Sequence, residues 1–330
     1  MKSIRLIGIE KGRVALEEFD TPLPCPGEVV VKTEWTLVSA GTERAFLLGL
    51  ENALRPFPMR IGYNQAGTIM AVGDGVTAFA IGDRVATNGN HASHTTANTE
   101  NVFRLPDNLT LDHAVFFNMI GIALQGIRKA SVETGDGVLV LGLGMVGQLA
   151  LQCAGLQGGF PLLAADVSDK RLALAKLCGA DFTFNLNESV FEKKLAAATS
   201  GKGPSVVIEA TGSPAPVNTA FQLAARGGRV VLLASTRGET ERVNFYRDVH
   251  LKGLTILGAH NNVRPEENST AGYWTWRDDA ELVLRLLAAK RFSIEPLVSH
   301  RVGFTDAPDL YNKHLLQWNE DVMGVLIDWK

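Results

Sequence analysis

The pattern of hydrophobic and polar positions changes character once, near residue 119. Before that point, short alternating or β-branched runs are separated by Gly and Pro turns, which is typical of antiparallel strands. No regular alternation of strand and helix is present there, so we expect a compact barrel-like or sandwich unit. The expected strands include Ser3–Ile9, Arg13–Phe19, Glu28–Trp35 and Gly67–Val72.

From about residue 119 to about 260, short apolar runs alternate with Ala- and Leu-rich helical segments. This alternation predicts βαβ units and a parallel sheet. One of the helices, Lys170–Cys178, is followed by Gly179, a residue suited to end it. The number of strands is that of a doubly wound dinucleotide-binding fold. The expected strands are Val138–Leu141, Leu162–Ala165, Phe182–Asn185, Val206–Glu209, Arg229–Leu233 and Leu254–Gly258.

The last part of the chain contains a Trp- and Tyr-containing stretch, an amphipathic helix near Asp278–Lys290 and an apolar run at Met323–Trp329. The pattern therefore divides the chain into 1–118, 119–262 and 263–330.

A glycine motif follows the first strand of the parallel part. Gly142, Gly144 and Gly147 occupy the three positions of G-x-G-x-x-G, and an apolar helix containing Met145 and Val146 begins there. The first glycine permits a sharp turn, the second lets the backbone approach a pyrophosphate, and the third lets the helix pack closely on the strand. The pyrophosphate would bind at the helix N-terminus.

Asp166 ends the next apolar run, about 20 residues after the motif. Its carboxylate can accept hydrogen bonds from both ribose hydroxyls and would repel a 2′-phosphate, so we expect NAD rather than NADP. Arg171 is then expected to be a surface or adenine-edge residue rather than a phosphate clamp. The alternative is a purely structural turn in which Asp166 caps a helix.

Composition limits the partners and the compartment. The 330 residues are 46% hydrophobic with a formal net charge of −3 and no long basic run, so we expect neither nucleic acid nor anionic membrane as a partner. No window has the length and apolarity of a membrane span, and the N-terminus reads directly into a strand. The three cysteines are widely separated, which favours reduced thiols and a cytoplasmic location over a disulfide framework or a cysteine-based zinc site.

Several ordered motifs make the whole chain resemble the medium-chain dehydrogenase/reductase superfamily. They are the glycine motif and the segments Pro26–Lys32, Ala71–Val76, Ile81–Val85, Leu105–Leu109, Leu177–Asp181 and Glu209–Gly212. The resemblance implies a GroES-like catalytic domain over 1–118, a Rossmann domain over 119–262, and a return segment, 263–330, that completes the catalytic domain. It also implies an active site in the cleft between the domains, and a homodimer or homotetramer built through edge pairing of the last Rossmann strand.

The resemblance extends to the positions that hold catalytic zinc in many relatives. Here those positions read Ala40, Tyr63 and Asn118, and the four-cysteine structural lobe is missing from the segment 88–101. Because Zn²⁺ prefers thiolate, imidazole or carboxylate ligands, we expect a zinc-independent member with no metal site. The segment Ser39–Arg44 is similar to the threonine/sorbitol dehydrogenase-like group, which includes bacteriochlorophyllide dehydrogenases.

Without a Lewis acid, a side chain has to polarise the substrate oxygen and move a proton. By the resemblance, Thr42 lies at the relay hydroxyl position and Tyr63 at the former histidine position. A phenol, with a reference pKa of about 10, suits a donor in the reduction direction. Asn118 could orient the alcohol, and Glu43 could support it or receive the proton. Alternatively, Tyr63 and Asn118 are only polar lining residues.

The resemblance also assigns the residues beside the nicotinamide. Thr211–Gly212, Ala234–Ser235 and Gly258–Ala259 would edge the nicotinamide and its ribose, and His260 is a candidate for substrate contact. His91 and His94 are expected in a loop, where a solvated or hydrogen-bonded role is favoured over a proton relay or metal fragment.

The sequence thus predicts a zinc-independent, NAD-dependent oxidoreductase that interconverts a secondary alcohol and a ketone on a polyol, sugar or cyclitol. The alternatives are an NADPH-dependent quinone or enone reductase, a redox-neutral enzyme that retains NAD, and a nucleotide-binding protein without turnover.

Overall fold

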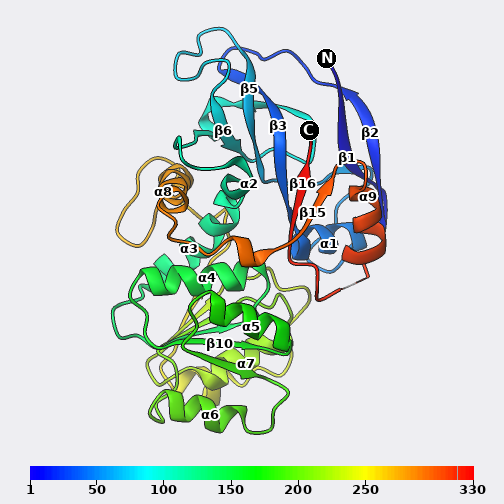
Figure 1. Cartoon of the computed structure of the whole chain (residues 1–330). Helices are drawn as coiled ribbons and strands as arrows, with labels where there is room; N and C mark the ends of the chain where they lie inside the picture. The colour runs from blue at the N-terminus through cyan, green and yellow to red at the C-terminus, as the bar shows by residue number, and fades with distance from the viewer. Residues whose placement is uncertain (318) are drawn as a thin grey trace. The chain divides into compact units, whose positions relative to one another are not determined.

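The computed structural model describes residues 1–317 and 319–330, and it divides into two compact units (Figure 1). The first unit comprises Met1–Asn118 and Ala280–Lys330, and the second comprises Met119–Asp279. The expected Rossmann domain ended at 262, whereas 263–279 belong to the second unit in the structure. Within that unit, Arg264 pairs with Asp279 at 2.6 Å.

The first unit is built on two sheets. A seven-stranded sheet has the order β15-β16-β3-β5-β6-β8, with β7 also pairing with β3, and a three-stranded sheet has the order β2-β1-β4. Its strands are β1 (Lys2–Glu10), β2 (Arg13–Asp20), β3 (Glu28–Ser39), β4 (Met59–Arg60), β5 (Gln65–Val72), β6 (Arg84–Thr87), β7 (His94–Asn98), β8 (Val102–Arg104), β15 (Val298–Gly303) and β16 (Gly324–Asp328). Its helices are α1 (Ala40–Leu48), α2 (Leu111–Ala114) and α9 (Ala307–Leu310), and a π-helix, η4, spans Tyr311–Leu315.

Strand β3 is the centre of this unit. It extends four residues beyond the expected end at Trp35, because its last residues pair with β16 in the antiparallel register Leu326↔Leu37. The two strands run side by side although they come from opposite ends of the chain (Figure 1). The core beneath them contains Leu6, Val38 and Leu47 together with Tyr311 and Val325. The C-terminal segment is therefore part of the first unit's core.

The second unit holds a six-stranded parallel sheet in the order β11-β10-β9-β12-β13-β14. The chain moves outward from β9 to one side and then returns to the other, which is the doubly wound arrangement with its switch point between β9 and β12. The strands are β9 (Val138–Leu141), β10 (Leu162–Asp166), β11 (Phe182–Asn185), β12 (Val206–Glu209), β13 (Arg229–Leu232) and β14 (Thr255–Gly258). Each expected strand is present, with ends that differ from the expectation by one residue at most.

Helix α3 (Phe117–Ala130) precedes this sheet, and helices between its strands bury apolar side chains against it. They are α4 (Met145–Leu156), α5 (Asp169–Leu177), α6 (Phe191–Ala198) and α7 (Ala215–Leu223), followed by the π-helix η2 (Phe245–His250). Helix α8 (Trp276–Ala288) begins in the second unit and ends in the first. Helix α5 ends one residue before the expectation, and Gly179 follows it with a φ of +101°, the left-handed conformation for which glycine is suited. The sheet core includes Leu139, Leu163 and Val207.

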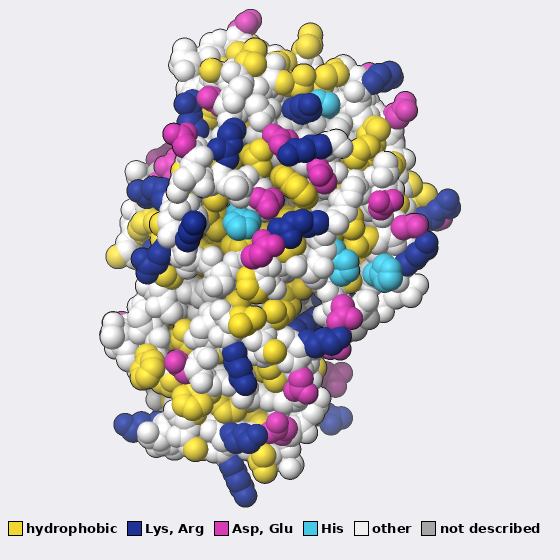
Figure 2. Space-filling view, viewed as in Figure 1, with side chains coloured by type: hydrophobic (Ala, Val, Ile, Leu, Met, Phe, Trp, Pro, Cys, Tyr) yellow, Lys and Arg dark blue, Asp and Glu magenta, His cyan; other side chains and the backbone are white. Residues whose placement is uncertain are grey.

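Surface charge is mixed rather than segregated. On the face shown in Figure 2, basic and acidic side chains are interspersed and form no continuous basic patch. None of the helices in the described part of the chain is long and apolar enough to cross a membrane.

Candidate nucleotide site and catalytic group

The turn between β9 and α4 has the geometry that a dinucleotide requires. Gly142 has a φ of +87°, and a Cβ there would lie 2.7 Å from Thr211 Cγ2. A Cβ on Gly147 would overlap the carbonyl oxygen of Gly142. A Cβ on Gly144 would meet nothing within 4 Å, so the space beside this backbone is open. The first and third glycines are required by packing, and the second leaves room for a ligand.

Helix α4 starts at Met145, directly after Gly144, and Gly144 supplies no side-chain cap. The first backbone N–H groups of the helix, including those of Met145 and Val146, therefore remain available to an anion. Together with the open space beside Gly144, this fits the pyrophosphate of a dinucleotide.

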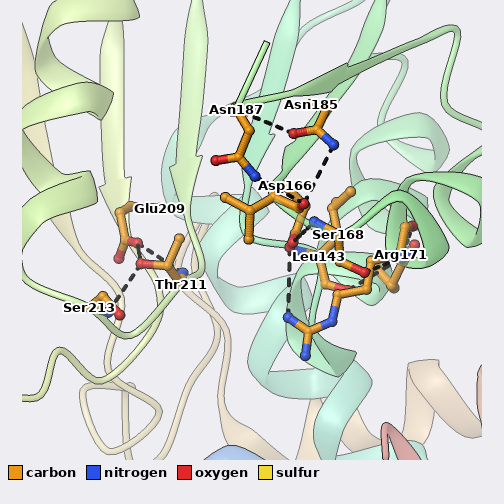
Figure 3. Close-up of polar contacts among 11 residues, drawn as sticks. Leu143, Asp166, Ser168, Arg171, Asn185, Asn187, Glu209, Thr211 and Ser213 are labelled. Atoms are coloured by element: carbon orange, nitrogen blue, oxygen red, sulfur yellow. Dashed lines mark hydrogen bonds and ion pairs between the residues drawn. The ribbon is translucent and has the colours of Figure 1, made fainter. Parts of the chain in front are cut away.

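Asp166 lies at the end of β10 and is 5% exposed. Its Oδ2 accepts a hydrogen bond from the backbone N of Leu143 at 2.7 Å, and its Oδ1 accepts one from Ser168 N at 2.9 Å (Figure 3). A carboxylate oxygen can accept two hydrogen bonds, so each oxygen keeps one position for a ribose hydroxyl. The N-cap of α5 is Ser168, not Asp166.

Arg171 lies beside this carboxylate. Its Nη1 is 3.8 Å from Asp166 Oδ2, and its side chain is 16% exposed. The sequence placed Arg171 at the adenine edge without indicating this ion pair. The pair partly balances the charge of Asp166. It therefore weakens the repulsion between this carboxylate and the 2′-phosphate of NADP.

A second polar turn follows β12. The fully buried Glu209 accepts hydrogen bonds at Oε1 from Thr211 N, at 2.8 Å, and from the Thr211 hydroxyl, while Ser213 N donates to that hydroxyl at 3.1 Å (Figure 3). Burial raises the pKa of Glu209, and the two bonds from Thr211 oppose the rise. The carboxyl thereby orders the Thr211–Gly212 turn, whose threonine packs against Gly142.

The three expected nicotinamide-side pairs follow the ends of three neighbouring strands. The backbone nitrogens of Leu233 and Ala234 donate to Glu209 O at 3.0 and 3.1 Å, and Ala259 N donates to Leu232 O at 3.1 Å. A Cβ on Gly212 would lie 3.4 Å from Ser235 O. The structure therefore brings Thr211–Gly212, Ala234–Ser235 and Gly258–Ala259 together at the carboxyl ends of β12, β13 and β14. His260 comes next, is exposed, and accepts a hydrogen bond at Nδ1 from Asn262 N at 3.2 Å.

Within the first unit, Tyr63 and Asn118 lie together. The Tyr63 hydroxyl donates to Ser39 Oγ, and Asn118 Nδ2 donates to the Tyr63 carbonyl oxygen at 3.0 Å. Ser39 ends β3 immediately before Ala40, so the three positions that the resemblance assigns to zinc lie close together. Asn118 Oδ1 is buried and has no hydrogen-bond partner within the described residues. Thr42 lies nearby on α1 and is half-buried.

Glu43 is 1% exposed and belongs to a buried group that the sequence did not predict. Its oxygens accept hydrogen bonds from Ser39 N at 2.7 Å and from the Tyr311 hydroxyl, and His91 Nε2 lies 3.2 Å away. Of the two expected roles for His91 in its loop, the structure shows the hydrogen-bonded one, because its side chain is fully buried against Glu43. His94 does not lie in the loop as expected, because it is the first residue of β7. Burial, followed by the charge of Glu43, raises the pKa of Tyr311, which keeps that phenol protonated as a donor.

These residues do not fit a zinc ion. Ala40 has no ligating atom, the Tyr63 hydroxyl is engaged in its hydrogen bond to Ser39, and Asn118 offers only a neutral amide oxygen, which is not among the ligands that Zn²⁺ prefers. Among the residues that the structure describes, no group of three or more His, Cys, Asp or Glu side chains could hold a metal.

The doubly wound sheet, its glycine turn and the carboxylate at the end of β10 define a dinucleotide-binding protein. The alcohol dehydrogenase GroES-like domain model matches residues 25–128, and the zinc-binding dehydrogenase model matches residues 145–275. The chain belongs to the medium-chain dehydrogenase/reductase superfamily, and it is an NAD(P)-dependent oxidoreductase.

Similar proteins cover most of the chain. D-guloside 3-dehydrogenase of Shigella flexneri is 29% identical over 271 residues, which cover 81% of this chain and 77% of that protein. L-threonine 3-dehydrogenase of Pyrococcus furiosus is 28% identical over 319 residues, covering 87% of each. The crystal structure of galactitol-1-phosphate dehydrogenase from Escherichia coli has a TM-score of 0.86 at 24% identity and covers 99% of this chain and 100% of that one.

Proposed function

We propose that the protein is a zinc-independent, NAD-dependent dehydrogenase that interconverts a secondary alcohol and a ketone on a polyol, sugar or cyclitol. The observation that carries the proposal is the Ser39–Tyr63–Asn118 group, because Tyr63 and Asn118 form hydrogen bonds at two of the three positions that the resemblance assigns to zinc, and the third position is Ala40. The sugar and polyol names of the relatives support the substrate class.

The chain's own residues divide the work between the two units. A bound nicotinamide dinucleotide would supply the hydride acceptor or donor. In the second unit, Asp166 would hold the ribose hydroxyls and the N-terminus of α4 the pyrophosphate. In the first unit, the Tyr63 phenol would hydrogen-bond the substrate oxygen and hold its proton, with Ser39 Oγ receiving the phenol's hydrogen bond when the substrate is absent.

The preference for NAD rests on Asp166. A 2′-phosphate would be placed against a buried carboxylate, and such like charges repel strongly. Arg171, 3.8 Å from that carboxylate, is the feature that favours the alternative, an NADPH-dependent reductase.

A turnover assay distinguishes these functions. Absorbance at 340 nm would be followed with NAD and with NADP across polyols, sugars, cyclitols, quinones and enones, using protein whose metal content is known from elemental analysis. We expect alcohol oxidation with NAD that survives exhaustive chelation. Loss of turnover with loss of zinc would contradict zinc independence, and double-bond reduction with NADPH would favour the reductase.

We also propose a cytoplasmic homodimer or homotetramer. Cys25, Cys153 and Cys178 are all free; Cys25 is exposed, while Cys153 and Cys178 are buried, and burial raises the pKa of Cys178 to about 11, which suits packed, reduced thiols at those two positions. Strand β14 ends the sheet order, so its outer edge could pair with a second copy. Light scattering after size-exclusion chromatography would give the mass, and a monomer would refute the oligomer.

A further inference from the structure

The segment from Gly258 to Arg264 is hydrogen-bonded to side chains on one face of α3. Lys129 Nζ donates to Gly258 O at 3.0 Å, and Gln125 Nε2 donates to His260 O at 3.1 Å and to Val263 O at 2.8 Å. Gln125 and Lys129 are four residues apart, so they project from the same side of the helix. Helix side chains thus satisfy carbonyls that the sheet, which ends at Gly258, leaves unpaired.

The far end of the segment has a second anchor. Arg264 bonds through Nη1 to Asp279 at 2.6 Å, through Nη2 to Gly121 O at 2.8 Å, and through Nε to Asn261 Oδ1 at 3.1 Å. Asp279 is fully buried and also accepts a hydrogen bond from Arg128 Nε at 2.9 Å. Because Gly121 and Arg128 are also on α3, the segment is held by this helix at both ends.

A hydrogen bond within the segment determines which nitrogen of His260 can donate. His260 Nδ1 accepts a hydrogen bond from Asn262 N, so a neutral imidazole carries its proton on Nε2. The ring is exposed while its backbone is held. The segment therefore holds a hydrogen-bond donor, His260 Nε2, just beyond the carboxyl end of β14, where the resemblance places the nicotinamide.

We propose that Gln125 and Arg264 are positioning residues for His260, and that they govern the alcohol–ketone step rather than the affinity for the nucleotide. This inference rests on the function proposed above. Gln125 Oε1 is buried and has no partner in the described part of the chain, which is unfavourable for folding. A leucine would avoid that penalty, so the two hydrogen bonds from Gln125 Nε2 are what the glutamine provides.

The chain contains a matched control. Gln148, on α4, is also fully buried, its Oε1 also has no partner within the described residues, and its Nε2 donates to two carbonyls. Those carbonyls are Leu143 O at 3.3 Å and Arg171 O at 2.9 Å, which belong to the pyrophosphate and ribose side of the site. Gln125 and Gln148 therefore make the same kind of contacts on opposite sides of the proposed nucleotide site.

The test compares Gln125→Leu with Gln148→Leu in the full chain. For Gln125→Leu we expect amide hydrogen exchange at Asn262 and Val263 to accelerate about tenfold or more and kcat to fall about tenfold or more, with the Kd for NADH, from fluorescence titration, within about threefold of wild type. For Gln148→Leu we expect the Kd for NADH to rise about tenfold and exchange at those two amides to stay unchanged.

Arg264→Met is the second variant, because it leaves Arg128 and Asp279 as a balanced buried pair. We expect it to change exchange and kcat in the same direction as Gln125→Leu. Unchanged exchange in both variants would overturn the proposal, as would faster exchange with unchanged kcat. If the wild-type protein oxidises no alcohol, the proposed function fails, and hydrogen exchange still decides whether Gln125 and Arg264 position the segment.

Discussion

At the scale of single residues, two phenols of the first unit make similar hydrogen bonds in different surroundings. Tyr63, at one of the positions that the resemblance assigns to zinc, donates to Ser39 Oγ, whereas Tyr311 is fully buried and donates to Glu43. The first arrangement leaves the phenol able to exchange its partner for a substrate oxygen. The second holds together a core that also contains a buried carboxylate.

Replacing each phenol separately tests this difference. We expect Tyr63→Phe to lower kcat about 100-fold, in line with the loss of a general acid–base group, and to leave the melting temperature and the Kd for NADH nearly unchanged. Tyr311→Phe should instead reduce the free energy of unfolding by about 1–3 kcal/mol, because Glu43 loses a buried donor. Equal effects of both variants on kcat would contradict a catalytic role for Tyr63.

The raised pKa of Glu209 predicts how the stability of the folded protein depends on pH. Its pKa is raised in the folded protein, mainly by burial, so the folded state binds more protons than the unfolded state above the ordinary carboxyl range. Stability from this group is therefore fully present below the unfolded pKa of about 4.5 and is lost as pH rises through the raised folded value.

We expect Glu209→Gln to remove that decline, because the amide oxygen can still accept both bonds from Thr211 without carrying a charge. Urea unfolding at several pH values between about 5 and 8 gives the free energy of unfolding of the wild type and of the variant. The difference between the two free energies isolates Glu209, because the other titrating groups are the same in both proteins. A difference that does not change with pH would show that Glu209 is ionised throughout.

At the scale of elements, two glycines of the β9–α4 turn have different roles: Gly147 is needed for packing, and Gly144 leaves space for a ligand. A Cβ on Gly147 would overlap Gly142 O, whereas a Cβ on Gly144 would meet no protein atom within 4 Å. Gly144 also has a φ of −66°, which alanine adopts without strain.

We expect Gly147→Ala to destabilise the second unit by about 1–3 kcal/mol, as overpacking does. Gly144→Ala should leave the unfolding free energy nearly unchanged and weaken NADH binding at least about tenfold, since its methyl group enters the space that we assign to the pyrophosphate. Thermal unfolding and fluorescence titration of both variants test the pair, and unaltered NADH binding by Gly144→Ala would place the pyrophosphate elsewhere.

At the scale of the whole molecule, the first unit needs the end of the chain. Leu326 on β16 is fully buried and pairs with Leu37 on β3. Before β16 is added, β3 lacks one of its sheet partners and part of its core is uncovered.

We expect Leu326→Ala to reduce the free energy of unfolding by about 2–5 kcal/mol through lost burial and a cavity. Leu16→Ala, at a position 36% exposed on β2, is the comparison and should have a much smaller effect. Denaturant unfolding measures both, and a similar small loss in each would mean that β16 is not integral to the first unit.

The parts that could be predicted from the sequence are those whose signal is local. The strand ends of the parallel sheet, the three glycines and Asp166 follow from short patterns, because a turn, a close approach and a strand-end carboxylate each have a characteristic residue type. The resemblance of ordered motifs added the places of Tyr63, Asn118 and the nicotinamide-side pairs.

Other parts depend on partners that are distant in the chain. Tyr311 and Glu43 are 268 positions apart, and nothing near either residue indicates the other. The same holds for Arg128 and Asp279, which are 151 positions apart.

The sequence by itself determined the class of fold, the nucleotide turn and the absence of zinc ligands from three expected positions, because period, glycine spacing and residue chemistry are properties of short stretches. Only the tertiary structure decided that His91 is buried, that Glu209 orders the Thr211 turn, and that α3 holds the segment carrying His260. Those facts depend on contacts between residues that are distant in the sequence. Burial at these contacts then determines the charge state and the mobility of each side chain.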